Sequence, residues 1–81
     1  MYFGGRNYEW PDFVMQNIIG LRDERIARGM TAQMLSEVTG VSRISIHGYE
    51  NLGQWPLPEN YNKLARYFNW QLWTNPKVRR Y

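Results

Sequence analysis

The sequence predicts an all-α protein with four to five short helices. Apolar residues recur at spacings of three and four in several segments, which is the period of an amphipathic helix. No segment alternates between apolar and polar residues with the period of a strand. Glycine and proline interrupt the helical segments often enough that each helix must be short.

Composition restricts the chain to one small domain with few kinds of chemistry. It has 81 residues, of which 43% are hydrophobic. The absence of cysteine excludes disulfides and thiolate metal sites, and the single histidine, His47, cannot form a metal site alone. No apolar run approaches the roughly 20 residues that span a bilayer, and the start lacks a secretory signal. We therefore expect a cytoplasmic protein without membrane association.

The first helix is expected over residues 12–28. Asp12 is expected to cap its start and Gly29 to end it. One face of this helix carries Val14, Ile18, Leu21 and Arg25. Residues 1–11, which contain two glycines and several aromatic residues, are expected to form an N-terminal arm.

The second helix is expected to be capped by Thr31 and to run to about Val38. Leu35 and Val38 should face the core. Gly40 follows, and glycine adopts the positive φ of a tight turn without strain.

The third helix is expected over residues 43–51, with Ser42 as its cap. Ile46, Tyr49 and Glu50 recur at spacings of three and four and should face inward. After a loop, Pro58 suits the first turn of a fourth helix. The buried face of the fourth helix should consist of Tyr61, Leu64, Ala65 and Phe68.

The C-terminal part is expected to contain a short turn near residues 71–73 and a basic tail over residues 74–81. The helical domain should therefore cover residues 12–73. The aromatic residues outside the central helices could fold back over the core or form an oligomer interface. They are Tyr2, Phe3, Tyr8, Trp10, Trp70, Trp73 and Tyr81.

Two charged residues are expected to face the core. Arg25 lies on the apolar face of the first helix, and Glu50 lies on the inward side of the third. A buried charge is costly unless it is paired. We therefore expect Arg25 and Glu50 to form a structural ion pair between these helices.

Two short helices joined by a glycine-containing turn form a helix-turn-helix. The run LRDERIARGMTAQMLSEVTGVSRISIHGYEN, followed by Pro56 and ENYNKLARYFNW, resembles the lambda-repressor-like (Cro/repressor, XRE-type) family of DNA-binding domains. The resemblance covers residues 18–73. The matching positions are Arg25, Gly29, Thr31, Leu35, Gly40-Val41-Ser42, Ile46, Tyr49-Glu50-Asn51 and Leu64-Ala65. It implies double-stranded DNA as the partner and the same Arg25–Glu50 pair.

In helix-turn-helix proteins the second helix of the motif enters the major groove. The residues expected to contact bases are Ser42, Arg43, Ile44 and His47, with Gly48 at the edge of this outward set. Arg43 suits guanine, Ile44 a thymine methyl, and Ser42 and His47 a base or a phosphate. Alternatively, Ile44 packs under the preceding helix and His47 is an ordinary surface histidine.

Contacts to the DNA backbone are expected at helix N-termini and in the loop after the third helix. The expected residues are Thr31, Ala32, Gln33, Ser45, Asn51, Gln54 and Trp55. Three positions depart from the family pattern. Ala32 replaces a phosphate-binding glutamine, Leu52 replaces a glycine, and the loop LGQWPLP lacks lysine and arginine. Few phosphate contacts are therefore expected, compensated by a homodimer on a near-palindromic site.

The resemblance implies a small transcriptional regulator of bacterial or phage type that occupies an operator. It would act as a repressor by occlusion or as an activator by contact with polymerase, and the sequence leaves both open. No cofactor or small-molecule ligand is expected. An alternative is a protein-interaction module on the same scaffold, such as an anti-repressor or adaptor. An enzyme is not expected, because the sequence shows no nucleophile–base pair, carboxylate dyad, metal cluster or glycine-rich phosphate loop.

Overall fold

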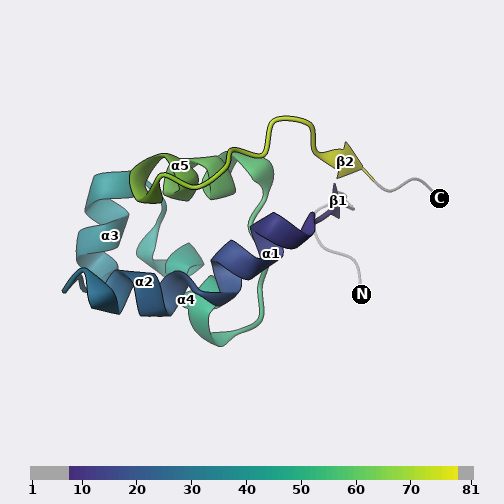
Figure 1. Ribbon diagram of the computed structural model, residues 1–81. Helices are drawn as coiled ribbons and strands as arrows, with labels where there is room; N and C mark the ends of the chain where they lie inside the picture. The colour runs from purple at the N-terminus through teal and green to yellow at the C-terminus, as the bar shows by residue number, and fades with distance from the viewer. Residues whose placement is uncertain (1–7, 79–81) are drawn as a thin grey trace.

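The computed structural model describes residues 8–78, and these contain five helices and a small two-stranded ribbon. The elements are β1 (Tyr8–Glu9), α1 (Asp12–Ile19), α2 (Leu21–Ala27), α3 (Ala32–Thr39), α4 (Arg43–Asn51), α5 (Pro58–Phe68) and β2 (Lys77–Val78). Figure 1 shows α3 at the end of the molecule opposite β1 and β2. The all-α class with short helices is confirmed.

The expected single helix over residues 12–28 is wrong, because the chain bends at Gly20 and forms α1 and α2. Gly20 has φ −87° and ψ 3°, outside the helical range. Its N–H still donates to Gln16 O at 3.1 Å, and Glu24 N–H donates to Gly20 O at 3.0 Å. The hydrogen bonding of the helix backbone therefore continues across the bend, and Val14, Ile18 and Leu21 on its two sides are buried.

Asp12 does not cap α1. The N-cap is Pro11, which is extended, and no side chain hydrogen-bonds the first turn. Asp12 is instead the first helical residue, where a carboxylate is still favoured by the helix dipole.

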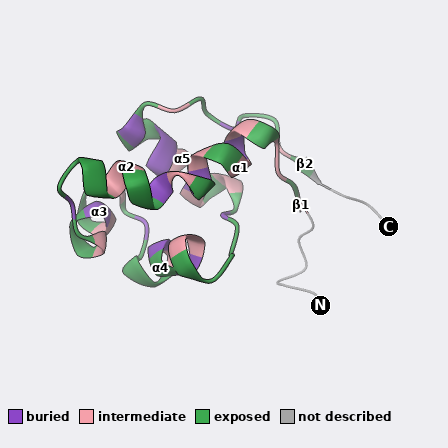
Figure 2. Ribbon diagram, turned by 60° about the horizontal axis from the view of Figure 1, so that its bottom comes forward, coloured by how far each residue is buried: buried purple, intermediate pink, exposed green. Residues whose placement is uncertain are grey.

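The core lies between the helices and is formed mainly by the residues whose spacing predicted burial. Figure 2 shows the buried residues toward the middle of the molecule and the exposed ones outside. Val38 is the exception, since 55% of it is exposed. Val41 is buried instead, because the turn at Gly40 directs the chain back toward the core. The largest fully buried side chains are Tyr61, Leu21, Leu35, Ile46, Leu64, Val14 and Val41.

The segment after α5 is extended and forms no turn at residues 71–73, contrary to expectation. Asn62 of α5 holds it in place: Trp73 N–H donates to Asn62 Oδ1 at 2.8 Å, and Asn62 Nδ2 donates to Trp73 O at 3.1 Å. These two bonds satisfy the backbone of Trp73 without a local turn.

The two ends of the described chain pair as an antiparallel ribbon, which the sequence did not predict. Tyr8 lies opposite Val78, and Glu9 opposite Lys77. Strands of two residues are too short to show an alternating pattern. The ribbon therefore replaces part of the expected arm and tail.

Aromatic residues on this side of the molecule pack over the core. The Tyr8 and Trp73 rings are 5.9 Å apart between centroids, and Tyr61 and Trp73 are 6.2 Å apart. Trp10 Nε1 donates to Pro56 O at 2.7 Å. Tyr8, Trp10 and Trp70 therefore pack against the core, to which Trp73 itself belongs, while Tyr2, Phe3 and Tyr81 lie outside the described residues.

Tyr61→Phe is expected to lower the free energy of unfolding by about 1–2 kcal/mol. The buried Tyr61 hydroxyl accepts from Asn17 Nδ2 at 3.0 Å and donates to Gln71 O at 2.9 Å, so the variant leaves both groups unpaired. Chemical denaturation measures the loss. The control is Tyr67→Phe: Tyr67 is 36% exposed, and its hydroxyl donates to the sulfur of Met30, which is a weak acceptor. Equal losses in the two variants would contradict the role of the buried hydroxyl.

Tyr61 also predicts how stability depends on alkaline pH. Burial raises the pKa of Tyr61 above its usual value of 10.0, because the phenolate is poorly solvated there. When the pKa of a tyrosine is higher in the folded than in the unfolded state, its contribution to the free energy of unfolding is intact below the unfolded-state pKa. That contribution is lost as the pH rises through the folded-state pKa. The free energy of unfolding of the wild type should thus fall more steeply above about pH 10 than that of Tyr61→Phe.

Candidate nucleic-acid interface

Helices α3 and α4 form a helix-turn-helix whose starts and turn are set by local sequence. Thr31 Oγ1 accepts from Met34 N–H at 3.1 Å, and Ser42 Oγ accepts from Ser45 N–H at 3.1 Å. Between the helices, Gly40 adopts φ +82°, a conformation that favours glycine. Both helix N-termini therefore have defined positions.

An ion pair fixes the inward side of α4 to α2. Arg25 Nε donates to Glu50 Oε2 and Arg25 Nη2 to Glu50 Oε1, both at 2.9 Å. Arg25 Nη1 also donates to Met30 O at 2.8 Å. The side chains are only 13% and 3% exposed, and the hydrogen bonds that Arg25 donates to Glu50 raise the pKa of Arg25 against the effect of burial. Because the contact is bidentate, it fixes the rotation of α4 as well as its position.

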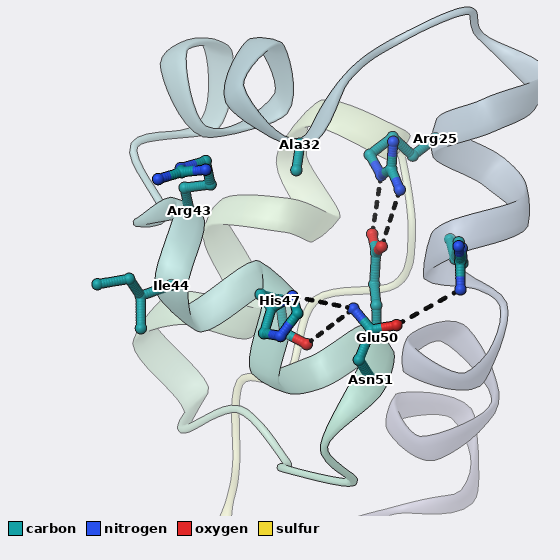
Figure 3. Close-up of a pocket in the computed structure, with 8 residues that line it drawn as sticks. Arg25, Ala32, Arg43, Ile44, His47, Glu50 and Asn51 are labelled. Carbon is teal, nitrogen blue, oxygen red and sulfur yellow. Dashed lines mark hydrogen bonds and ion pairs between the residues drawn. The ribbon is translucent and has the colours of Figure 1, made fainter.

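The opposite side of α4 faces outward. Figure 3 shows Arg43 and Ile44 pointing away from the Arg25–Glu50 pair. Arg43 and His47 are exposed, and Ile44 is 81% exposed. Ile44 therefore does not pack under α3, which removes one of the two interpretations of this residue.

A hollow of about 310 Å³ lies between α2, α3 and α4. Ala32, at the start of α3, lies across it from α4 (Figure 3). Its other seven lining residues come from α2 and α4: Arg22, Arg25, Arg43, Ile44, His47, Glu50 and Asn51. The hollow thus connects the two helix N-termini with the outward side of α4.

His47 and Asn51 hydrogen-bond to one another along α4. Asn51 Nδ2 lies 3.1 Å from His47 Nδ1 and 3.3 Å from His47 O. With the amide in this orientation, Nδ1 accepts, and the neutral imidazole carries its proton on Nε2. His47 is therefore oriented by Asn51 as a hydrogen-bond donor and is more than an isolated surface residue.

Arg22 is a residue of this surface that the sequence analysis missed. It is exposed on α2, and its Nη1 donates to Asn51 Oδ1 at 3.4 Å. It lines the first hollow and a second one of about 290 Å³ beside Gln54 and Trp55. The available signal was its position three residues before Arg25, which places both on one helix face.

Six of the seven expected backbone-contacting residues occupy two places. Thr31, Ala32 and Gln33 open α3, and Gln33 Nε2 donates to Glu37 Oε2 at 3.2 Å. Asn51, Gln54 and Trp55 lie together at the second hollow. Ser45 is half-buried, and its hydroxyl is hydrogen-bonded to that of Ser42, the N-cap of α4.

Gly48 differs from expectation because it is buried and does not join the outward surface. The side chain of Gln54 covers it: Gln54 Cδ lies 2.7 Å from the place that a Cβ on Gly48 would take. A loop residue thus occupies the space over the middle of α4.

Other kinds of site are not evident in the described residues. Residues 8–78 contain no group of three or more histidine, cysteine, aspartate or glutamate side chains that could hold a metal ion. Within the same range no helix has the length and hydropathy needed to cross a membrane.

Comparison with known proteins gives one finding, at the level of the family. A helix-turn-helix family model matches residues 21–70, more than half of the chain, from the start of α2 to just beyond α5. No curated protein and no solved structure gives a significant match. The matched range contains the capped α3 and α4, the turn at Gly40 and the Arg25–Glu50 pair. The chain belongs to the lambda-repressor-like (XRE-type) helix-turn-helix family, a family of DNA-binding domains.

Proposed function

We propose that this protein is a sequence-specific double-stranded DNA-binding regulator of transcription, of bacterial or phage type, with α4 in the major groove. The observation that carries the proposal is the two-sided character of α4. Its inner side is fixed by Glu50, and its outer side exposes Arg43, Ile44 and His47. A rigid helix with an outward polar and apolar surface is what base readout requires.

Each exposed residue has a role that fits its chemistry. The Arg43 guanidinium pairs with O6 and N7 of a guanine, and Ile44 contacts a thymine methyl. Ser42 lies at the N-terminus of α4, and His47 presents Nε2–H as a donor. These four residues read the bases, and the geometry of their helix sets their register.

Contacts to phosphates come from the start of α3 and from Arg22. Thr31, Ala32 and Gln33 supply N–H groups at a helix N-terminus, which favours an anion. Arg22 adds a cation at the other end of the surface. Because the slope of log affinity against log salt is about −0.9 per neutralised phosphate, we expect a shallow salt dependence.

A homodimer on a near-palindromic operator would compensate for the small interface. Two copies would then read half-sites about 34 Å apart. Exposed apolar side chains in and near the loop after α4, Leu52 at 61% and Leu57 at 41%, support self-association. Binding there regulates transcription by occlusion of the operator or by contact with polymerase.

Selection of bound duplexes from a random pool tests the proposal. We expect enrichment of one short sequence, or of a near-palindrome of two such sequences. A pool without enrichment, binding that ignores sequence, or no binding at low salt would refute it. A stable complex with another protein together with no DNA binding would favour the protein-interaction module.

Ala32→Gln is expected to tighten binding to the selected duplex by about fivefold, the value of one net hydrogen bond. Glutamine at this position binds a phosphate in related domains, and Ala32 lines the hollow across from α4. Fluorescence anisotropy measures the affinity. Ala27→Gln makes the same change at an exposed position of α2 and should have no effect. Equal affinities of the two variants would contradict the placement of α3 against the duplex backbone.

A further inference from the structure

Gly48 occupies a position on α4 from which a side chain would face the duplex. Residues four apart lie on one side of a helix, so Gly48 shares its side with Ile44. Ile44 is 81% exposed, whereas Gly48 is buried. The burial of Gly48 therefore comes from a segment outside α4.

That segment is the loop after α4, and Gln54 is the residue that provides the cover. Gly53 has φ +68°, which turns the chain back toward the helix. The N–H groups of Leu52 and Gln54 both donate to Gly48 O, at 3.0 and 3.1 Å. The Gln54 side-chain Oε1 and Cδ then lie where a Cβ on Gly48 would be. Glycine at this position is what permits the contact.

The Gln54 amide is available for binding. The residue is exposed. Within residues 8–78 its backbone N–H makes a hydrogen bond, and its side-chain amide makes none. A glutamine amide carries one acceptor and two donors, and it pairs bidentately with N7 and N6 of adenine. Because Gly48 lies on the same side of α4 as Ile44, an amide placed over Gly48 lies on the outward side of α4.

We propose that Gln54 is a base-reading residue that acts in place of the side chain missing at Gly48, and that it recognises an adenine. This inference rests on the proposed function, since it requires α4 in the major groove. It changes the role expected for Gln54 from a contact with the backbone to a contact with a base.

The two roles differ in what a substitution removes. A phosphate contact positions the protein and carries no sequence information, so its loss weakens binding to all sequences equally. A base contact contributes preference at one base pair, and its loss removes that preference alone. The pattern of selected sequences therefore separates the roles.

The experiment is selection from a random duplex pool with the wild type, Gln54→Ala, Gln54→Glu and Gly48→Ala. In the wild type we expect an adenine preference of about tenfold or more at one base pair of each half-site. Gln54→Ala should lose this preference and keep the others. Gln54→Glu should prefer cytosine there, because a carboxylate accepts from cytosine N4.

Gly48→Ala is the matched variant, because it keeps glutamine at position 54 and changes only the space that the Gln54 side chain occupies. Its added Cβ displaces the flexible Gln54 amide, so the same base pair should lose its preference. The melting temperature should stay equal or rise, because alanine favours the helix. Retention of the adenine preference in Gln54→Ala or in Gly48→Ala would overturn the proposal.

Arg43→Ala in the same selection distinguishes this inference from the proposed function. If Arg43→Ala loses preference at its own base pair and Gln54→Ala loses none, only the role of Gln54 is overturned. If the wild type enriches no sequence, both are overturned.

Discussion

Glu50→Ala should lower the free energy of unfolding by about 3 kcal/mol, the largest loss that we expect from a single polar substitution in this chain. The change leaves the Arg25 guanidinium, which is 13% exposed, without its bidentate partner. Arg25 keeps its hydrogen bond to Met30 O, but its charge is no longer compensated. Thermal and chemical denaturation, followed by circular dichroism, measure the loss.

Glu24→Ala provides the control for this prediction. Glu24 Oε1 lies 3.9 Å from Arg28 Nε. Both side chains are more than 40% exposed, so water screens the pair. Its loss should cost less than about 0.5 kcal/mol. If Glu50→Ala cost no more than Glu24→Ala, the Arg25–Glu50 pair would not hold α4 against α2.

Arg43→Ala should weaken binding to the selected duplex by about 10- to 100-fold, the value of one bidentate contact to guanine. Arg43 is exposed and makes no contact that stabilises the core, so the melting temperature should stay unchanged. Binding to an unrelated duplex should fall far less, because a non-specific complex lacks the base contact. Anisotropy titrations against the two duplexes measure both quantities.

Arg66→Ala is the matched control, since it removes the same charge from an exposed position on α5. The reduction there should be small and equal for both duplexes. If the two variants weakened binding to the selected duplex equally, Arg43 would contribute only net charge.

The elements governed by local sequence could be predicted from it. Thr31 and Ser42 cap their helices, and Gly40 turns the chain, because each effect acts within three residues. The Arg25–Glu50 contact was predictable for another reason. Two opposite charges on apolar helix faces have a low-energy arrangement only as a pair.

Features that depend on distant contacts could not be predicted in this way. The β1–β2 ribbon and the bonds of Asn62 to Trp73 join segments whose proximity no local pattern reveals. The position of Gln54 over Gly48 depends on how the loop turns at Gly53. The base-reading and backbone-contacting roles remain predictions, because they concern a partner outside the chain.

Chemical-shift mapping by nuclear magnetic resonance, with isotope-labelled protein and the selected duplex, tests most directly whether the outward side of α4 meets DNA. The largest shifts should fall on Ser42, Arg43, Ile44 and His47, with smaller ones at the start of α3. Shifts concentrated around Trp10 and Trp73, with α4 unchanged, would contradict the account.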